Sequence, residues 1–147
     1  MFGVGGGTSS YAEVEDTDFV LLWGSNARDA HPIYFHHLLK GLSEGAKMFA
    51  VDPRRTASAK FADLWLGIDV GTDISLANAM AREIIAADLH DKNFIEHATA
   101  GFDAFAEHVD EYTLERAAAT TGVAAEAIRE LAHEYATAPT AQILWTL

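Results

Sequence analysis

Hydrophobic and polar residues fall in blocks along this chain, and the sharpest boundary comes at residue 24. Five large apolar residues at 19–23 (FVLLW) end at a glycine, and polar residues and a proline follow. The run is too short for a typical helix and rich in β-favouring side chains, so it predicts a strand covered on both faces. Gly24 permits a sharp turn or the close approach of a ligand. Asn26 or Asp29 can cap the helix that Pro32 helps to begin.

The next segment predicts a second strand beside the first. Apolar residues follow a helical period over 33–45, with glycines near the end, and a second apolar run occupies 46–51. A strand, a helix and a strand in about 33 residues are typical of a βαβ unit, whose crossover is right-handed. Asp52, Pro53 and Arg54 come directly after the second strand. We therefore expect two ligand-type loops at one edge of a parallel sheet.

The rest of the chain predicts one more short strand and a mostly helical region. Residues 64–68 suit a third strand, and a long amphipathic helix runs from 73 to about 89, with Thr72 or Asp73 as its N-cap. Further expected elements are a glycine-rich loop at 1–10, short helical segments at 11–18 and 56–62, helices at 92–98, 102–111, 113–120 and 124–138, and a strand at 141–147. The predicted fold is α/β, with a mostly parallel sheet of three to four strands and a helical C-terminal part.

Composition narrows the possible classes of function. The 147 residues are half hydrophobic, which suits a single domain over 1–147. There is no cysteine, so this chain cannot form disulfides, ligate an Fe–S cluster or use a thiol nucleophile. A net charge of −12 argues against nucleic-acid binding, and any anionic ligand must be held locally. No long apolar segment or signal peptide is evident, so we expect a cytoplasmic protein without membrane contact.

Three loops follow strand-like runs and carry the candidate binding residues. They are Gly24-Ser25-Asn26 with Asp29, Asp52-Pro53-Arg54, and Gly71-Thr72-Asp73. Each alone has an ordinary explanation as a turn or helix cap. Their shared position at the ends of strands is the signal, because open α/β sheets bind ligands there. Together the three loops predict a nucleotide-binding cleft.

The side chains suit a nucleotide. Asp52 or Asp73 can accept two hydrogen bonds in one plane, as a guanine edge or two ribose hydroxyls require. Arg54 can stack on a base or donate two hydrogen bonds to phosphate. Gly24 and Gly71 would admit the ligand to backbone amides.

Other chemistries find less support. A G-x-G-x-x-G motif is absent after the first strand, which argues against an ordinary NAD or FAD domain. His36 and His37 are adjacent, so on a helix they point about 100° apart and lack the spacing of paired metal ligands. We predict no catalytic and no metal-binding residue in this chain.

Several segments resemble one known family. They are DTDFVLLWGSNARDAHP at 16–32, GAKMFAVDPR at 45–54 and FADLWLGIDVGTDISLANA at 61–79, followed by DKNFI at 91–95, TGV at 121–123 and AIRELA at 127–132. In order and spacing they resemble the molybdopterin guanine dinucleotide oxidoreductases of the DMSO reductase superfamily, and most of all the catalytic subunits of formate dehydrogenases. The resemblance extends over almost the whole chain.

The resemblance implies a Rossmann-like three-layer αβα domain that binds the guanosine end of a molybdopterin guanine dinucleotide carrying molybdenum or tungsten. By position it places Asn26 and Asp29 near phosphate and ribose, Asp52 and Arg54 near the guanosine, and Gly71 with Asp73 at its ribose or base. The family's Fe–S cysteines and metal ligand lie outside this chain. We therefore expect a fragment of a larger enzyme, inactive alone, whose partners are the rest of the catalytic subunit and electron-transfer subunits.

Two other functions stay open. A stand-alone NAD-type dehydrogenase predicts saturable NAD binding and turnover without metal. A non-catalytic interaction module predicts self-association through an unfinished sheet edge and no nucleotide binding.

Overall fold

The computed structural model describes residues 9–145 of the chain. The predicted glycine-rich loop lies largely outside the described residues, and so do the last two residues of the predicted final strand. The chain divides into two compact units, residues 1–65 with 139–147 and residues 66–138. The expectation of a single domain over 1–147 stays a prediction.

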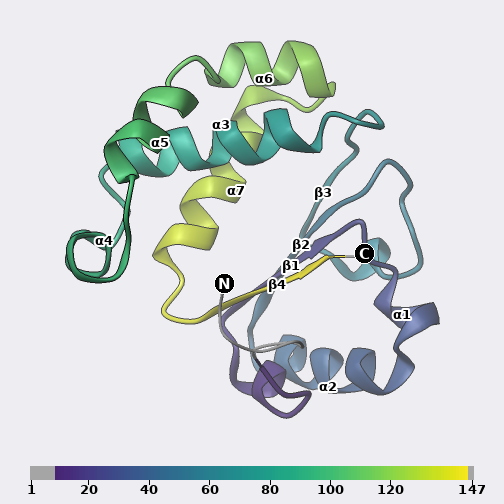
Figure 1. The fold of residues 1–147 in the computed structure, drawn as a ribbon. Coiled ribbons are helices and arrows are strands. Elements are labelled where there is room, and N and C mark those ends of the chain that lie inside the picture. Colours follow the sequence, from purple (N-terminus) through teal and green to yellow (C-terminus); the bar gives the residue numbers. More distant parts are fainter. Residues whose placement is uncertain (1–8, 146–147) are drawn as a thin grey trace. The chain divides into compact units, whose positions relative to one another are not determined.

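The first unit is built on a parallel sheet (Figure 1). Its strands lie in the order β3-β2-β1-β4, and β1 pairs in parallel with both β2 and β4. The elements are the 3₁₀ helix η1 (Glu13–Asp16), β1 (Phe19–Trp23), α1 (Ala27–Ala30), α2 (Pro32–Ser43), β2 (Lys47–Val51), the 3₁₀ helix η2 (Ala59–Phe61), β3 (Leu64–Leu66, whose last residue falls in the second unit) and β4 (Ala141–Trp145). The predicted α/β fold with a parallel sheet is confirmed.

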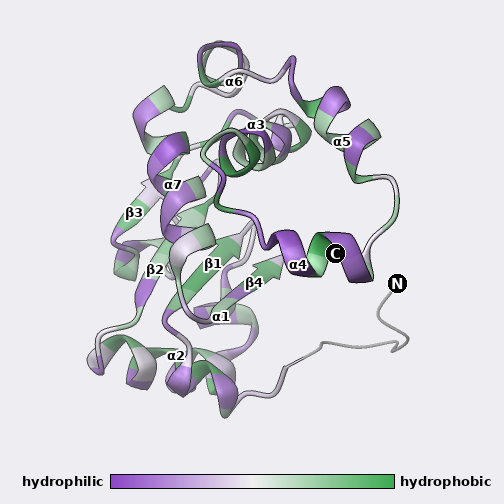
Figure 2. Cartoon of the chain, turned by 90° about the vertical axis from the view of Figure 1, so that its left-hand side faces the viewer, coloured by the Kyte–Doolittle hydropathy of each residue, from purple (hydrophilic) through white to green (hydrophobic). Residues whose placement is uncertain are grey.

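The first strand is buried on both faces, as its unbroken apolar run predicts. Val20 and Leu22 belong to a core cluster with Leu38 of α2. The alternate residues Phe19 and Leu21 are equally buried. Figure 2 shows β1 as hydrophobic along its length, whereas the helices carry polar and apolar residues side by side. This pattern is the one expected of a central parallel strand.

The helix α2 packs closely on η1. Gly41 lies inside α2, and a Cβ built on it would come within 2.7 Å of the Val14 carbonyl oxygen. Glu15 of η1 accepts a hydrogen bond from Lys40 at 2.9 Å and pairs with His37. The bonds from Lys40 and His37 lower the pKa of Glu15. Steric fit and a small ion-pair cluster therefore join η1 to α2.

The second unit is helical among its described residues. It contains α3 (Asp73–Ala86), α4 (Lys92–Ala98), α5 (Phe102–Val109), α6 (Leu114–Thr121) and α7 (Ala125–Thr137). The helix α3 contacts α5, α6 and α7 (Figure 1). Its Glu83 accepts hydrogen bonds from Arg129 at 3.3 Å and His133 at 3.1 Å, both on α7. This unit therefore has its own core around α3.

Element boundaries differ from the sequence predictions in a few places. Residues 27–30 form a separate short helix, α1, before α2 begins at Pro32. The helix α2 ends before Gly45, whose φ of 108° suits a helix stop, whereas Gly41 is an interior packing position. The helix α3 ends at Ala86 instead of about 89. Among the described residues, no helix is long and apolar enough to cross a membrane, and the cytoplasmic location stays a prediction.

The packing at Gly41 predicts whether an alanine at this position stabilises or destabilises the fold. An exposed Gly→Ala change inside a helix normally stabilises, by about 1 kcal/mol. At Gly41 the new Cβ would meet a backbone carbonyl that cannot move freely, so we expect Gly41→Ala to destabilise by about 1–3 kcal/mol. Urea unfolding monitored by circular dichroism measures the difference. His36→Ala on the exposed face of α2 is the control, and a stabilised Gly41→Ala variant would contradict the close contact.

Candidate functional site

The ends of β1 and β2 hold the first two candidate loops side by side. Trp23 pairs with Val51 as the last residue of each strand. The Gly24 N–H then donates to the Val51 carbonyl at 2.7 Å. Gly24 has a φ of 63°, a left-handed conformation that glycine adopts without strain. Ser25 follows it and is half-buried. The loops after the two strands therefore begin side by side, at strand ends that are hydrogen-bonded to each other.

A buried serine ties the two loops together. Ser58 is fully buried, and its hydroxyl donates to Asn26 Oδ1 at 2.9 Å while accepting from the Arg28 N–H at 2.9 Å. The Ser58 N–H also donates to Asn26 Oδ1, at 3.3 Å. Asn26 Nδ2 donates in turn to Asp29 Oδ2 at 2.6 Å. The polar groups of Asn26 thus face the protein and fix the loop.

This network corrects the predicted helix cap. Asn26 occupies the N-cap position of the short helix α1 without a side-chain capping bond, and His31 precedes α2. Neither Asn26 nor Asp29 caps the helix that begins at Pro32. The reason is that the Asn26 side-chain oxygen already accepts from Ser58.

The second loop is held by bonds on both sides of Asp52. Asp52 is 6% exposed, and its Oδ1 accepts from the Arg54 N–H at 2.8 Å, which closes a tight turn across Pro53. The Trp65 indole N–H donates to the Asp52 carbonyl oxygen at 2.9 Å. One carboxylate oxygen therefore holds the turn, and Oδ2 is the atom that Asp52 can offer to a ligand in the same plane.

The two loops are positively charged within an acidic chain. Residues 24–31 and 52–61 carry four of the ten basic residues of the chain and only two of its 22 acidic ones. Arg28 lies over the Phe61 ring at 5.6 Å, and Arg55 lies over the Trp65 ring at 5.9 Å. Arg54 is exposed, and within residues 9–145 its guanidinium forms no hydrogen bond or ion pair. The guanidinium of Arg54 is therefore available to an anion, as is the exposed ammonium of Lys60, for which no side-chain hydrogen bond or ion pair forms within the described residues.

The third predicted loop belongs to the second unit. Gly71 has a φ of 85°, and the Thr72 hydroxyl donates to the Asp69 carbonyl at 2.6 Å instead of capping α3. Asp73 is the first residue of α3 and is exposed. The N–H of Asp69 donates to the Thr121 carbonyl at 2.9 Å, which anchors the loop on α6. That this loop joins the other two stays a prediction.

Sequence reasoning missed the residues that support the site. Ser58 and Trp65 position the loops, and Arg28 and Arg55 stack on aromatic rings. The cluster of basic residues at 24–31 and 52–61 is visible in the sequence and could have identified Arg28 and Arg55. The role of Ser58 had no local signal, because its partners lie about 30 positions away. The described residues contain no group of His, Cys, Asp or Glu arranged to hold a metal ion.

Comparison with known proteins identifies the family of this chain. A family model described as molybdopterin oxidoreductase matches residues 5–143. The chain belongs to the molybdopterin oxidoreductase family. Membership implies a molybdopterin cofactor that carries molybdenum or tungsten.

Named members of this family have different activities. Formate dehydrogenase H of Escherichia coli is 40% identical over 97% of this chain, and nitrate reductase of a Synechocystis species is 35% identical over 99%. The solved structure of acetylene hydratase from Pelobacter acetylenicus superposes with a TM-score of 0.81 at 34% identity over 92% of this chain. The chain spans only about a fifth of the length of each.

The buried serine gives a direct test of how the loops are joined. Replacing Ser58 with alanine removes one donor and one acceptor, so Asn26 Oδ1 and the Arg28 N–H each lose a partner. We expect Ser58→Ala to lower the free energy of unfolding by about 1–3 kcal/mol. Denaturant unfolding measures this loss. Ser43→Ala removes an exposed hydroxyl bonded only to its own helix and should cost much less. Equal effects of the two changes would contradict the role given to Ser58.

Proposed function

We propose that this chain binds the guanosine diphosphate end of a molybdopterin guanine dinucleotide. The loops at 24–29 and 52–54 of the first unit would hold it, and a contribution from Gly71, Thr72 and Asp73 stays a prediction. The observation that carries the proposal is the guanidinium of Arg54, unpaired within residues 9–145, on a hydrogen-bonded turn at the carboxyl ends of two parallel strands. Family membership indicates a molybdopterin cofactor. The side chains of the loops are the reason why we assign the nucleotide end of that cofactor to this chain.

The diphosphate has two kinds of donor available. Arg54 can donate paired hydrogen bonds to phosphate oxygens. The Gly24 N–H already donates to the Val51 carbonyl, so a backbone donor from this loop would be an N–H that follows Gly24, and glycine has no side chain to hinder its approach to the ligand. Residues 24–31 and 52–61, which include these loops, carry four basic residues and two acidic ones, so the local charge is positive within the acidic chain.

The guanosine part has an acceptor in Asp52. Its Oδ2 can accept from the guanine amino group or from a ribose hydroxyl, while Oδ1 holds the turn through the Arg54 N–H. Since Arg54 and Asp52 belong to one closed turn, the anion-binding and sugar- or base-binding groups are held in a fixed relation. Asn26, Asp29 and Ser58 position this arrangement from the neighbouring loop.

The bound cofactor would supply electron transfer at its metal, and this chain would supply binding and orientation. Relatives with different named activities match nearly all of this chain, which favours a task that those enzymes share. We propose that the whole enzyme is formate dehydrogenase-like, with 40% identity to formate dehydrogenase H as support. Its partners would be the rest of the catalytic subunit and electron-transfer subunits.

Titration with GDP tests the assignment of the loops. Arg54→Ala removes the proposed phosphate contact, so we expect GDP affinity to fall about tenfold or more, in line with a charged hydrogen bond of about 1.5–3 kcal/mol. Isothermal calorimetry at about 0.15 M salt measures it, because lower salt exaggerates the repulsion from the acidic surface. Lys60→Ala is the matched control, since it removes the same charge from an exposed position in the same loop segment.

Two further measurements distinguish the proposed nucleotide-binding role from that of a stand-alone NAD-type dehydrogenase. Asp52→Asn keeps an oxygen for the Arg54 N–H but removes the carboxylate, so we expect weaker GDP binding with unchanged stability. NAD should compete poorly with GDP, because the G-x-G-x-x-G turn is absent. GDP binding that ignores both Arg54→Ala and Asp52→Asn, or NAD binding tighter than GDP, would sink the proposal.

A further inference from the structure

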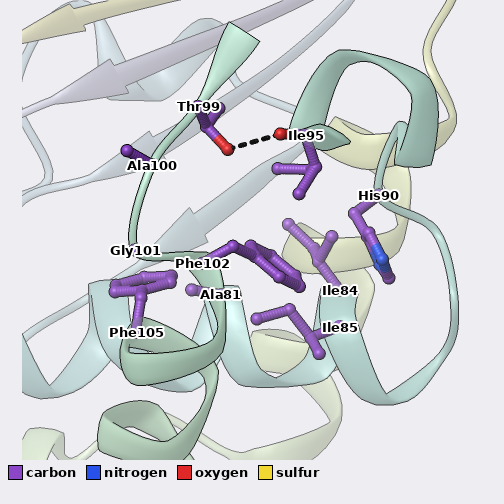
Figure 3. A pocket seen from close by; sticks show the side chains of 10 residues that line it. All are labelled: Ala81, Ile84, Ile85, His90, Ile95, Thr99, Ala100, Gly101, Phe102 and Phe105. Atoms are coloured by element: carbon purple, nitrogen blue, oxygen red, sulfur yellow. Dashed lines mark hydrogen bonds between the residues drawn. The ribbon is translucent and has the colours of Figure 1, made fainter. Parts of the chain in front are cut away.

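The helical unit contains an apolar pocket that the nucleotide proposal does not use. Its volume is about 350 Å³. Figure 3 shows side chains from α3, α4 and α5 converging on it, with Ile84, Ile95 and Phe102 among them. The segments at 88–91 and 99–101 complete the wall, the first through His90. All of these residues belong to the second unit, so the pocket is a feature of that unit alone.

The helix α4, on one side of this pocket, buries little of its apolar surface in this chain. The helix α4 has seven residues, none of them buried, and its Phe94 is 58% exposed. It stands apart from α6 and α7 in Figures 1 and 2. Isolated helices this short are unstable in water, and most helical stability in proteins comes from packing an apolar face. Phe105 of α5 lines the pocket and is also 45% exposed.

A polar atom in the pocket wall supports the same conclusion. His90 lines the pocket, and its Nδ1 is buried without a hydrogen-bond partner among the described residues. The imidazole packs against the Phe102 ring at 5.3 Å, which leaves Nδ1 in apolar surroundings. Buried polar atoms are nearly always satisfied in native proteins. The unsatisfied Nδ1 therefore marks this wall of the pocket as one whose polar group is not fully accommodated by the described residues.

We propose that the surface formed by α4, α5 and this pocket, here named the α4–α5 surface, docks an apolar segment of the same, longer polypeptide. The support is length: the matched relatives are about five times as long as this chain, so most of each lies outside the matched part. The docked segment would place a large aliphatic or aromatic side chain in the pocket and cover the exposed faces of Phe94 and Phe105. This inference rests on membership of the family, and it needs no nucleotide to bind.

Charge argues against a second copy of the chain as the occupant. Each copy carries a net charge of −12, and the surroundings of the pocket include Asp91, Glu96 and Asp103. Two copies joined through this face would bring like charges together, which opposes association. A segment of the same polypeptide is delivered at high effective concentration and can bring basic residues to this rim.

Hydrogen exchange measured by mass spectrometry tests the proposal without any cofactor. The chain of 147 residues is compared with the full-length protein translated from the whole gene. We expect the amides of α4 and of residues 99–101 to exchange at least about tenfold more slowly in the full-length protein, because docking suppresses local opening. Phe105→Asp in the full-length protein should restore fast exchange in α4 and leave α7 protected.

A matched variant and a second substitution keep the test decisive. Ile33→Asp places the same charge at an apolar residue that is 65% exposed on α2, and it should leave exchange in α4 unchanged. If Phe105→Asp also exposes α7, Ile95→Asp replaces it as the probe, since Ile95 lies on α4 itself. The proposal is overturned by a gene that encodes only these residues, by equal α4 exchange in both proteins, or by α4 protection in the short chain that rises with its concentration. A small molecule retained in the pocket in native mass spectra would overturn it as well.

Discussion

The parallel pairing of β1 with β2 is the constraint on which the candidate site depends. The register ends both strands together, at Trp23 and Val51, and the Gly24 N–H adds one more bond beyond the last pair. Both strands are fixed by burial, since every residue of β1 before Trp23 is almost fully buried. A register shift of one residue would turn the core side chains of β1 to the opposite face. The loop positions are therefore set by the hydrophobic core.

The polar residues of the two loops divide into those that build the loops and those that remain for a ligand. Asn26, Ser58 and the Arg28 N–H satisfy one another, and Asp52 Oδ1 closes its own turn. These bonds are internal, so their loss would change stability as much as binding. The Arg54 guanidinium has no such internal role among the described residues. The closed turn fixes the backbone of Arg54, so a ligand would have to order only its side chain and not the loop.

Most of the fold followed from local patterns, because its strands and helices have strong and separate signatures. The strand at 19–23 and the helix at 92–98 match their predicted bounds, and the helix at 125–137 lies within one residue of its prediction. The short helix α1 was missed because four residues carry too little periodicity to be recognised. The predicted capping role of Asn26 was wrong because its side-chain oxygen accepts a hydrogen bond from Ser58, which lies 32 positions away in the sequence. Such pairings depend on tertiary contacts that no local pattern encodes.

An acidic chain can hold an anionic ligand because electrostatic interactions are short-ranged at physiological salt. The Debye length there is about 8 Å, so exposed carboxylates beyond that distance from the bound phosphates contribute little. What matters is the local balance, and the loops at 24–31 and 52–61 are basic within a chain of net charge −12. The acidic remainder still has an effect, since it disfavours nucleic acid and other extended polyanions that would span many loops at once. A compact ligand with two phosphates meets only the basic loops. Under the proposed function, the charge distribution would select by the size of the anion, and the turn at Asp52 and Arg54 would add the chemical selection for a nucleotide.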